Sequence, residues 1–184
     1  MTQTETPRII SAAQALHCPV PCLVLTDNLT SWVAGRIKAH THGNYNHAMW
    51  VLNPGIVATQ DSVFKEAPLG DYLKGKHRVK FWYNPNWGPL QKAAVRAHLM
   101  QDVARGGRYD YCGILGQWAA SVFHWATLKR LQWPGREFCS EEAVDVLRQV
   151  ESGIKDAQPS PADLDRICIA SPRMKVWGIV DPTL

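Results

Sequence analysis

The feature that most constrains the fold is a pair of short apolar segments separated by three turn-forming residues. The segments cover residues 47–52 and 56–59, and Asn53, Pro54 and Gly55 lie between them. Asn, Pro and Gly favour tight turns, and two strands joined by so short a connection pair in antiparallel fashion. The sequence therefore predicts a β-hairpin and, with it, an antiparallel sheet.

Other strands and helices follow from the spacing of apolar residues. Strands are predicted at residues 20–25, which the polar residues 26–28 would end, at 78–83 and at 174–180. Helices are predicted at residues 31–38, 89–105 and 140–150, and a short turn at 160–164. Strands gathered in the middle and at the end of a chain, with helices between them, are typical of an α+β domain. We expect a mainly antiparallel sheet packed on helices.

The second and third of these helices have the clearest patterns. Pro89 suits the first turn of a helix, and Gly106 suits its end. In between, the apolar residues Val95, Leu99 and Val103 recur at four-residue spacing, as they do on one buried helix face. The helix at 140–150 has its own apolar face, formed by Ala143, Val144, Leu147 and Val150.

Length and composition indicate one globular domain. The chain has 184 residues, of which 46% are hydrophobic and 20% charged. A domain of this size can bury enough surface to fold without a disulfide or a metal. We expect a single domain over residues 1–184, with a core at about 20–181 and a flexible stretch at 1–10. The net charge of +4 comes from scattered Lys and Arg, so no nucleic-acid partner is predicted.

The N-terminus and the cysteines both bear on where the protein works. Residues 1–10 lack the basic and apolar layout of a signal peptide, so the expected location is the cytoplasm unless another export route exists. The five cysteines are expected to be reduced thiols. Cys18 and Cys22 lie close to His17, but further ligands at metal-binding spacing are missing from the pattern, so the sequence predicts no metal site and no cofactor.

The most apolar stretch covers residues 112–128 and has two interpretations. The simpler one is a buried helix, and the stretch is short for a bilayer span. The alternative is an exposed hydrophobic wall that contacts an apolar substrate or a membrane surface. The sequence alone leaves both open.

Cys139 is the strongest candidate for a chemically active residue. It stands at the predicted start of the helix at 140–150, where unpaired backbone N–H groups carry partial positive charge. That position favours the thiolate over the thiol, and the thiolate is the nucleophilic form. The same N–H groups, including that of Ser140, suit the stabilisation of an oxyanion. The plainer interpretation of Cys139 is an inert buried thiol, as we expect for the other four cysteines.

His47 is the matching candidate for a general base. It opens the first strand of the hairpin, and a base on a strand facing a thiol on a helix is the papain arrangement. A third polar group should lie on the adjacent strand to orient the imidazole. Gln60 is the expected third group, and Glu66 and Asp61 are the alternatives.

Five segments together resemble the circularly permuted branch of the NlpC-type papain-like superfamily, in particular its YiiX/YaeF-like cysteine amidase group. They are residues 45–51 (YNHAMWV), 58–60 (ATQ), 107–111 (GRYDY), 138–142 (FCSEE) and 160–164 (SPADL), and they span about residues 26–165 in the order of the family. The resemblance implies a papain-like α+β core in which the histidine strand precedes the cysteine helix. Gln60 departs from the glutamate that is common at the third position of this group.

The resemblance also implies roles for individual residues. Cys139 would be the nucleophile, His47 the base and Gln60 the third member, while Ser140 and Tyr45 would support the site. Tyr109 and Asp110 would support the fold nearby without a catalytic role. The implied reaction is acyl transfer through a thioacyl intermediate on the cysteine.

Three functions remain open at this point. The first is an amidase or peptidase that acts on cell-wall peptides or another amide-linked substrate. The second is a lipid-directed thioesterase or acyltransferase, with peripheral membrane contact through residues 112–128. The third is a catalytically inactive binding module that keeps the fold. The sequence specifies neither the acyl acceptor nor the oligomeric state.

Overall fold

The structure is a computed structural model that describes residues 7–30, 35, 38, 43–60, 63–106, 108–109, 136–137, 139–151, 154 and 159–183. The backbone alone is described for residues 108, 109, 136, 137 and 141. The predicted helix at 31–38 lies almost wholly outside the described residues, and the apolar stretch at 112–128 lies entirely outside them.

The described elements are both strands and helices. In chain order they are α1 (Ala12–Ala15), β1 (Cys22–Asn28), β2 (His47–Asn53), β3 (Ile56–Gln60), β4 (Phe64–Pro68), α3 (Leu69–Leu73), β5 (His77–Tyr83), α4 (Pro89–Arg105), β6 (Arg108–Tyr109), β7 (Arg136–Glu137), α6 (Cys139–Arg148), α7 (Pro161–Ala170) and β8 (Lys175–Val180). The described helices include none that is long and apolar enough to cross a membrane.

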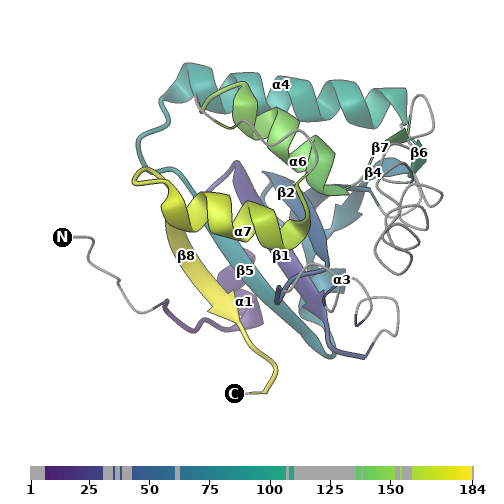
Figure 1. Cartoon of the computed structure of the whole chain (residues 1–184), viewed down its shortest axis with the longest axis vertical. Helices are drawn as coiled ribbons and strands as arrows, with labels where there is room; N and C mark the ends of the chain where they lie inside the picture. Colours follow the sequence, from purple (N-terminus) through teal and green to yellow (C-terminus); the bar gives the residue numbers. More distant parts are fainter. Residues whose placement is uncertain are drawn as a thin grey trace, which may run out of the picture.

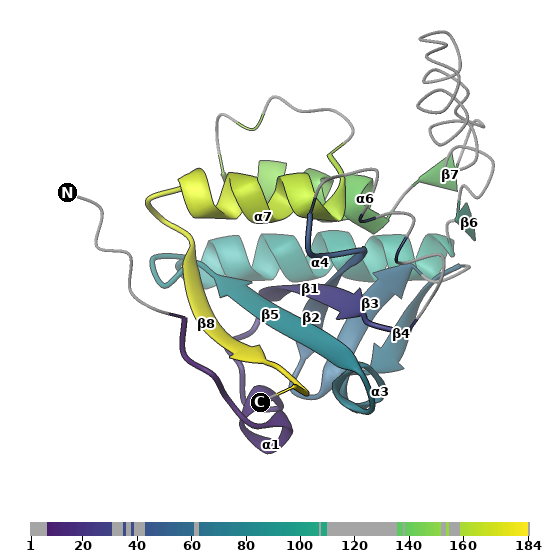
Figure 2. The ribbon, with the colours of Figure 1, turned by 60° about the horizontal axis from the view of Figure 1, so that its bottom comes forward.

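One large sheet organises the molecule. Six strands pair in the order β4-β3-β2-β1-β5-β8, and every pairing in it is antiparallel. Helices α4, α6 and α7 cover one face of this sheet, and α1 and α3 lie on the other side (Figures 1 and 2). The prediction of an α+β fold with a mainly antiparallel sheet is confirmed.

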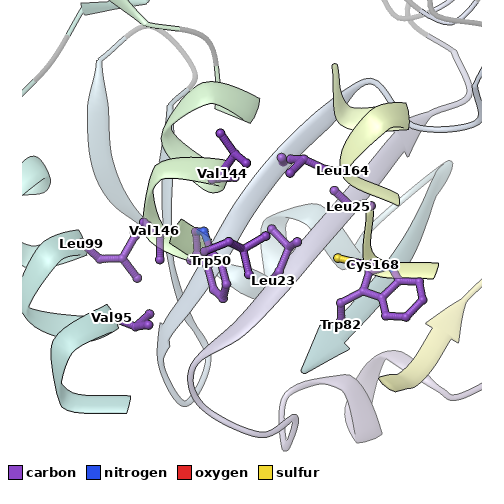
Figure 3. Close-up of a cluster of buried hydrophobic side chains, with 14 of the residues drawn as sticks. Leu23, Leu25, Trp50, Trp82, Val95, Leu99, Val144, Val146, Leu164 and Cys168 are labelled. Atoms are coloured by element: carbon purple, nitrogen blue, oxygen red, sulfur yellow. The ribbon is translucent and has the colours of Figure 1, made fainter. Parts of the chain in front are cut away.

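The two faces of the sheet carry separate hydrophobic clusters because side chains alternate along each strand. On β2, Ala48, Trp50 and Leu52 point to what we call the long-helix face, where they pack with α4, α6 and α7. Met49 and Val51 point to the opposite side, the short-helix face, where they pack with α1 and α3. Figure 3 shows how Trp50 and its neighbours meet the helices of the long-helix face.

The predicted end of the first strand is wrong. Thr26, Asp27 and Asn28 continue β1 and pair with β5 instead of forming a turn. Thr26 and Asp27 are buried, and the Asp27 carboxylate forms an ion pair with Lys38 at 2.7 Å. A partner for its charge lets a turn-favouring residue remain in a central strand.

The predicted turn at residues 160–164 is the beginning of a helix. Ser160 caps α7, since its hydroxyl accepts a hydrogen bond from the Asp163 backbone N–H, while the Asp163 side chain accepts one from the Ser160 N–H. Pro161 occupies the first turn of the helix, where a backbone N–H has no partner within the helix, so proline loses no hydrogen bond there. This capping box is a sequence signal for a helix start.

The remaining expected elements agree with the structure to within about two residues at each end, and five short elements among the described residues were not predicted. The hairpin, the helices at 89–105 and 140–150, and the strands at 78–83 and 174–180 correspond to β2 and β3, α4, α6, β5 and β8. The additional elements are α1, α3, β4, β6 and β7. Ile9 and Ile10, inside the stretch expected to be flexible, pair with the edge strand β8.

Candidate functional site

Cys139 is the first residue of α6, as the sequence predicted for the candidate nucleophile. Only 4% of its surface is exposed. Helix α6 packs on the long-helix face against β2, through Ala143, Val144 and Leu147. The thiol-bearing residue is therefore placed where a helix N-terminus meets the central part of the sheet.

The chain leading into Cys139 is held by a short ladder. Strand β7 ends two residues before Cys139 and pairs in parallel with β6, where Tyr109 lies opposite Glu137. The backbone at Tyr109 thus pairs with the segment next to the cysteine, and the supporting role expected for its side chain stays a prediction. The side chain of Tyr109 is not described, and Asp110 lies outside the described residues.

His47 lies at the start of β2, and its ring contacts two residues on the short-helix face. Its Nε2 atom lies 2.8 Å from the Thr59 hydroxyl oxygen, within hydrogen-bond distance. The ring also stacks on Tyr72 of α3, with centroids 6.2 Å apart. The Tyr72 hydroxyl donates a longer hydrogen bond of 3.5 Å to the same Thr59 oxygen. The three side chains form a small polar cluster, the His47–Thr59–Tyr72 cluster.

The register of the hairpin explains why Thr59 and not Gln60 meets His47. Met49 pairs with Thr59, so Thr59 and His47 lie diagonally on one face of the two strands. Gln60, one residue further, points to the other face. Its Oε1 atom, the acceptor that we expected to orient His47, is buried without a hydrogen-bond partner. Thr59 replaces Gln60 as the described partner of His47.

Glu66, the alternative third residue that the structure describes, does not take that position either. Glu66 lies on β4, is exposed, and pairs with Ala58 rather than with a residue of β2. Asp61 lies outside the described residues. A shift of one residue in the pairing of two strands moves a side chain to the other face of the sheet. The amino-acid composition does not predict that shift.

The described partners of His47 and the helix that carries Cys139 lie on opposite faces of the sheet. The described contacts of His47 are on the short-helix face, whereas α6 packs on the long-helix face. Both residues belong to the same part of the molecule, because α6 packs on β2 and His47 begins β2. Their pairing as nucleophile and base stays a prediction.

Tyr45 and Ser140, the other expected supporting residues, are both buried. Tyr45 belongs to the long-helix cluster, and its ring lies 5.8 Å from the Lys80 ammonium nitrogen. Burial raises the pKa of the Tyr45 hydroxyl, and the nearby Asp165 carboxylate raises it further. Lys80 in turn forms an ion pair with Asp165 at 2.7 Å. Tyr45 is therefore a neutral, packed residue beside a buried ion pair.

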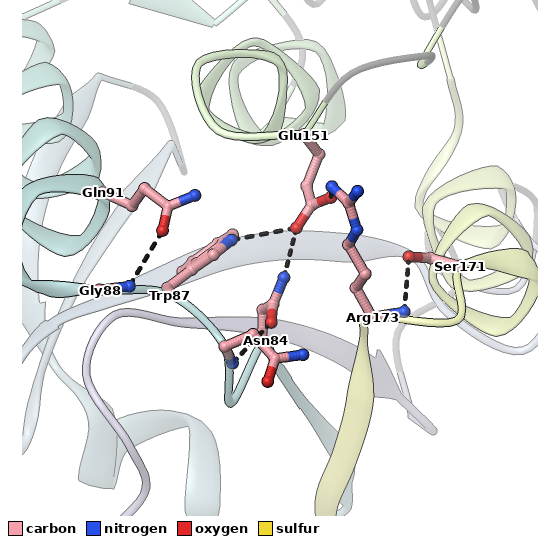
Figure 4. Close-up of polar contacts among 8 residues, drawn as sticks. Asn84, Trp87, Gly88, Gln91, Glu151, Ser171 and Arg173 are labelled. Carbon is pink, nitrogen blue, oxygen red and sulfur yellow. Dashed lines mark hydrogen bonds and ion pairs between the residues drawn. The ribbon is translucent and has the colours of Figure 1, made fainter.

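A second polar cluster closes the far end of α6. Glu151 is buried and accepts hydrogen bonds from the Asn84 amide and, at 3.0 Å, from the Trp87 indole (Figure 4). Arg173 approaches its other carboxylate oxygen at 3.5 Å. No pattern in the sequence indicated a role for these residues. They tie the end of α6 to the loop before α4 and to the chain before β8.

A third polar cluster joins α4 to α6 close to Cys139. The His98 Nε2 atom lies 3.2 Å from Asp102 Oδ2 and 3.9 Å from Glu142 Oε1. The ligand atoms of these three residues all lie within 4.8 Å of one another, a grouping compatible with a bound metal ion. We call it the His98–Asp102–Glu142 cluster.

The sequence predicts the proximity of two residues of this cluster but not of the third. His98 and Asp102 are four residues apart on a strongly predicted helix, which places both on one face. Glu142 comes from a separate helix, and only the packing of α6 on α4 brings it near. The expectation that no metal site exists considered the cysteines and overlooked this mixed set of donors.

The other described cysteines are packed thiols. Burial raises the pKa of Cys22 well above its usual value, and burial does the same for Cys168. A hydrogen bond from the Cys22 side chain lowers the pKa of Cys18 against the opposing effect of burial. High thiol pKa values at Cys22 and Cys168 make these two poor nucleophiles, in agreement with their expected structural role.

Comparison with known proteins gives a likeness of fold. No protein-family model matches the sequence, and no curated protein matches it. Among solved structures, the chain is similar to one described as metalloprotein yiiX from Escherichia coli O157:H7, DUF1105. The match has a TM-score of 0.53 and 12% sequence identity, and it covers 88% of this chain and 97% of that one. At this identity the comparison supports a yiiX-like fold and no more.

Proposed function

We propose that this protein is a cysteine-dependent hydrolase of the amidase or peptidase type, built on a circularly permuted NlpC-type papain-like domain. The observation that carries the proposal is the position of Cys139, buried at the first residue of a helix that packs on the central strands of the sheet. A thiol in that position is next to N–H groups that stabilise both a thiolate and an oxyanion.

In the proposed reaction, the His47 imidazole takes the proton of the Cys139 thiol. The thiolate sulfur then attacks the carbonyl carbon of an amide, and backbone N–H groups near Cys139 stabilise the oxyanion. The amine leaves with the proton from His47, and water cleaves the resulting thioester to release the acid and regenerate the thiol. The contact between His47 Nε2 and the Thr59 hydroxyl would hold the imidazole ring in one orientation.

The contacts of His47 place a condition on this proposal. The ring must reach Cys139 from the short-helix face, past the start of β2. His47 is the first residue of β2, so on one side no further residue of that strand lies between its ring and the other face of the sheet. A reactivity assay tests this condition without knowledge of the substrate.

The test is the rate of alkylation of Cys139 by iodoacetamide as a function of pH, followed by peptide mapping. The variants are His47→Ala and, as the matched control, His77→Ala, which removes an imidazole from β5 instead of β2. We expect fast alkylation of wild-type Cys139 at pH 6, well below the free-thiol pKa of about 8.5. The His47→Ala change should slow it, and the His77→Ala change should not.

Each result has a clear meaning. Ordinary thiol reactivity of Cys139 in the wild type would overturn the enzyme proposal and favour a binding module. Fast reaction that survives in His47→Ala would keep the nucleophile but reject the base. If the dyad holds, a screen of peptide amides, esters and phospholipids separates an amidase from a lipid-directed thioesterase or acyltransferase.

A further inference from the structure

We propose that the His98–Asp102–Glu142 cluster binds a divalent transition-metal ion that links α4 to α6. The proposal rests on this chain's own side chains and is independent of the reaction proposed for Cys139. It begins from the convergence of one imidazole and two carboxylates on a common point between two packed helices.

The distances within the cluster suit a shared metal ion. Ligand atoms about 2.1 Å from a tetrahedral metal lie about 3.4 Å from each other. The two distances from His98 Nε2, 3.2 Å to Asp102 Oδ2 and 3.9 Å to Glu142 Oε1, lie on either side of that value. A metal would therefore need only small adjustments of side chains that already face each other.

The charges in the cluster favour a cation. Two carboxylates approach one imidazole nitrogen, with Glu142 only 8% exposed and Asp102 13% exposed. Burial of charge is costly unless an opposite charge compensates it. Arg105 lies 3.3 Å from the other oxygen of Asp102, Oδ1, but it is 64% exposed, so its contribution is weakened by solvent. Asp102 Oδ2, the oxygen that faces the cluster, is buried without a hydrogen-bond partner.

The donor set indicates the kind of metal. One imidazole nitrogen with two carboxylate oxygens suits zinc, manganese or ferrous iron, whereas calcium and magnesium prefer oxygen donors alone. Three protein ligands leave a further position for water. His98 is 26% exposed, which gives an ion a route from solvent. A bound ion would hold α6, and with it the first turn that carries Cys139, against α4.

The competing explanation is a protonated His98 that forms ion pairs with both carboxylates. That explanation predicts no tight metal binding, and it predicts that low pH rather than metal strengthens the contact between the helices. The two explanations therefore differ in direct binding measurements, whether or not the protein has activity.

The experiment uses the full chain after removal of bound metal, titrated with Co²⁺ and followed by visible absorption and calorimetry. We expect one equivalent to bind with the d–d absorption of a nitrogen and oxygen site. Glu142→Gln, which keeps the shape of the side chain, and Asp102→Asn should each weaken binding by more than about tenfold. Asp145→Asn, which removes a carboxylate from the same helix α6, is the matched control and should bind like the wild type.

A second readout guards against misfolded variants. Zn²⁺ should raise the thermal unfolding midpoint of the wild type and of Asp145→Asn, and at the same Zn²⁺ concentration it should raise that of Glu142→Gln by less. The proposal is overturned if Co²⁺ binds equally well to wild type and Glu142→Gln. It is also overturned if bound Co²⁺ shows a thiolate charge-transfer band that Cys139→Ser or Cys18→Ser abolishes, because the metal would then be at a cysteine.

Discussion

The two faces of the sheet are built from the same strands but are covered very differently. The long-helix face is covered by α4, α6 and α7, which have 17, 10 and 10 residues. The short-helix face is covered in part by α1 and α3, which have four and five. Short helices contribute little stability of their own, so on that face packing against the sheet must supply nearly all of it.

Polar residues are also distributed unequally between the faces. On the long-helix face they tie helices to one another and to the sheet, through the Lys80–Asp165 pair, Glu151 and the His98–Asp102–Glu142 cluster. On the short-helix face, the His47–Thr59–Tyr72 cluster joins β2, β3 and α3. The comparison teaches that the helices around Cys139 are fixed by several polar links, while the described contacts of His47 are with Thr59 of β3 and Tyr72 of α3.

The largest effect is expected from truncation of neighbouring residues on the two faces of β2. Trp50→Ala should destabilise the protein by about 3–5 kcal/mol, and Met49→Ala by about 2–3 kcal/mol. Trp50 loses more because its ring also stacks on Trp87, with centroids 6.2 Å apart. Urea unfolding at pH 7 measures both, and equal losses would contradict the difference between the faces.

The polar link at the end of α6 comes next. Glu151→Gln should cost about 1–3 kcal/mol, because the amide cannot match a carboxylate that accepts bonds from Asn84 and Trp87. Glu66→Gln, at an exposed position on β4, is the control and should be neutral within about 0.5 kcal/mol. The same unfolding assay measures both variants, and a neutral Glu151→Gln would remove the evidence for a polar link there.

The His47–Thr59–Tyr72 cluster should contribute less. Thr59→Val removes the hydroxyl that lies 2.8 Å from His47 and should cost about 0.5–1.5 kcal/mol, while Thr59→Ser keeps the hydroxyl and should cost less. If Thr59 also orients the imidazole for Cys139, the Val variant alone should slow alkylation at pH 6. Equal alkylation rates in the two variants would limit Thr59 to a structural role.

The smallest effect concerns the N-terminal cap of α7 on the long-helix face. Desolvation tends to raise the pKa of Asp163, but its hydrogen bonds with Ser160 and Arg166 outweigh that effect and lower the pKa below the ordinary value. The Asp163 contribution to stability is thus present above the unfolded pKa of about 3.9 and is lost as the pH falls through the lower, folded pKa. By contrast, α3 has Pro68 at its N-cap and no side-chain cap.

Asp163→Asn should therefore reduce stability by about 0.5–1 kcal/mol at pH 7 and by less at pH 3. The measurement is the urea midpoint of wild type and variant at both values of pH. An equal loss of stability at pH 7 and pH 3 would show that the effect comes from the changed shape of the side chain and not from the charge of the carboxylate.

The fold could be predicted from sequence where periodicity was strong. The hairpin of β2 and β3 and the helices α4 and α6 followed from local patterns of turn residues and apolar spacing. Residues 26–28 were misassigned because their preference for turns is local, whereas the pairing of β1 with β5 is not. The start of α7 was missed because a Ser-Pro pair suggests a turn as readily as a capped helix.

The candidate site was predictable in part. The position of Cys139 at a helix start followed from the pattern of α6. The partner of His47 did not, since the choice between Thr59 and Gln60 depends on the register of two strands, and a shift of one residue exchanges the faces. The meeting of His98 with Glu142 depends on how two helices pack, which no local pattern contains.

The edge strand β8 has a consequence for solubility. Residues Arg8 and Ile10 hydrogen-bond to the backbone of Ile179 at 2.9 Å, so the segment before α1 covers part of an otherwise open sheet edge. Gly178 makes this close approach feasible, because a side-chain carbon there would lie 2.6 Å from Ile10. An uncovered edge strand recruits strands from other chains. Residues 8–10 thus protect this sheet edge from pairing with other chains, and a larger residue at Gly178 would clash with Ile10 and weaken that protection without touching any part of the candidate site.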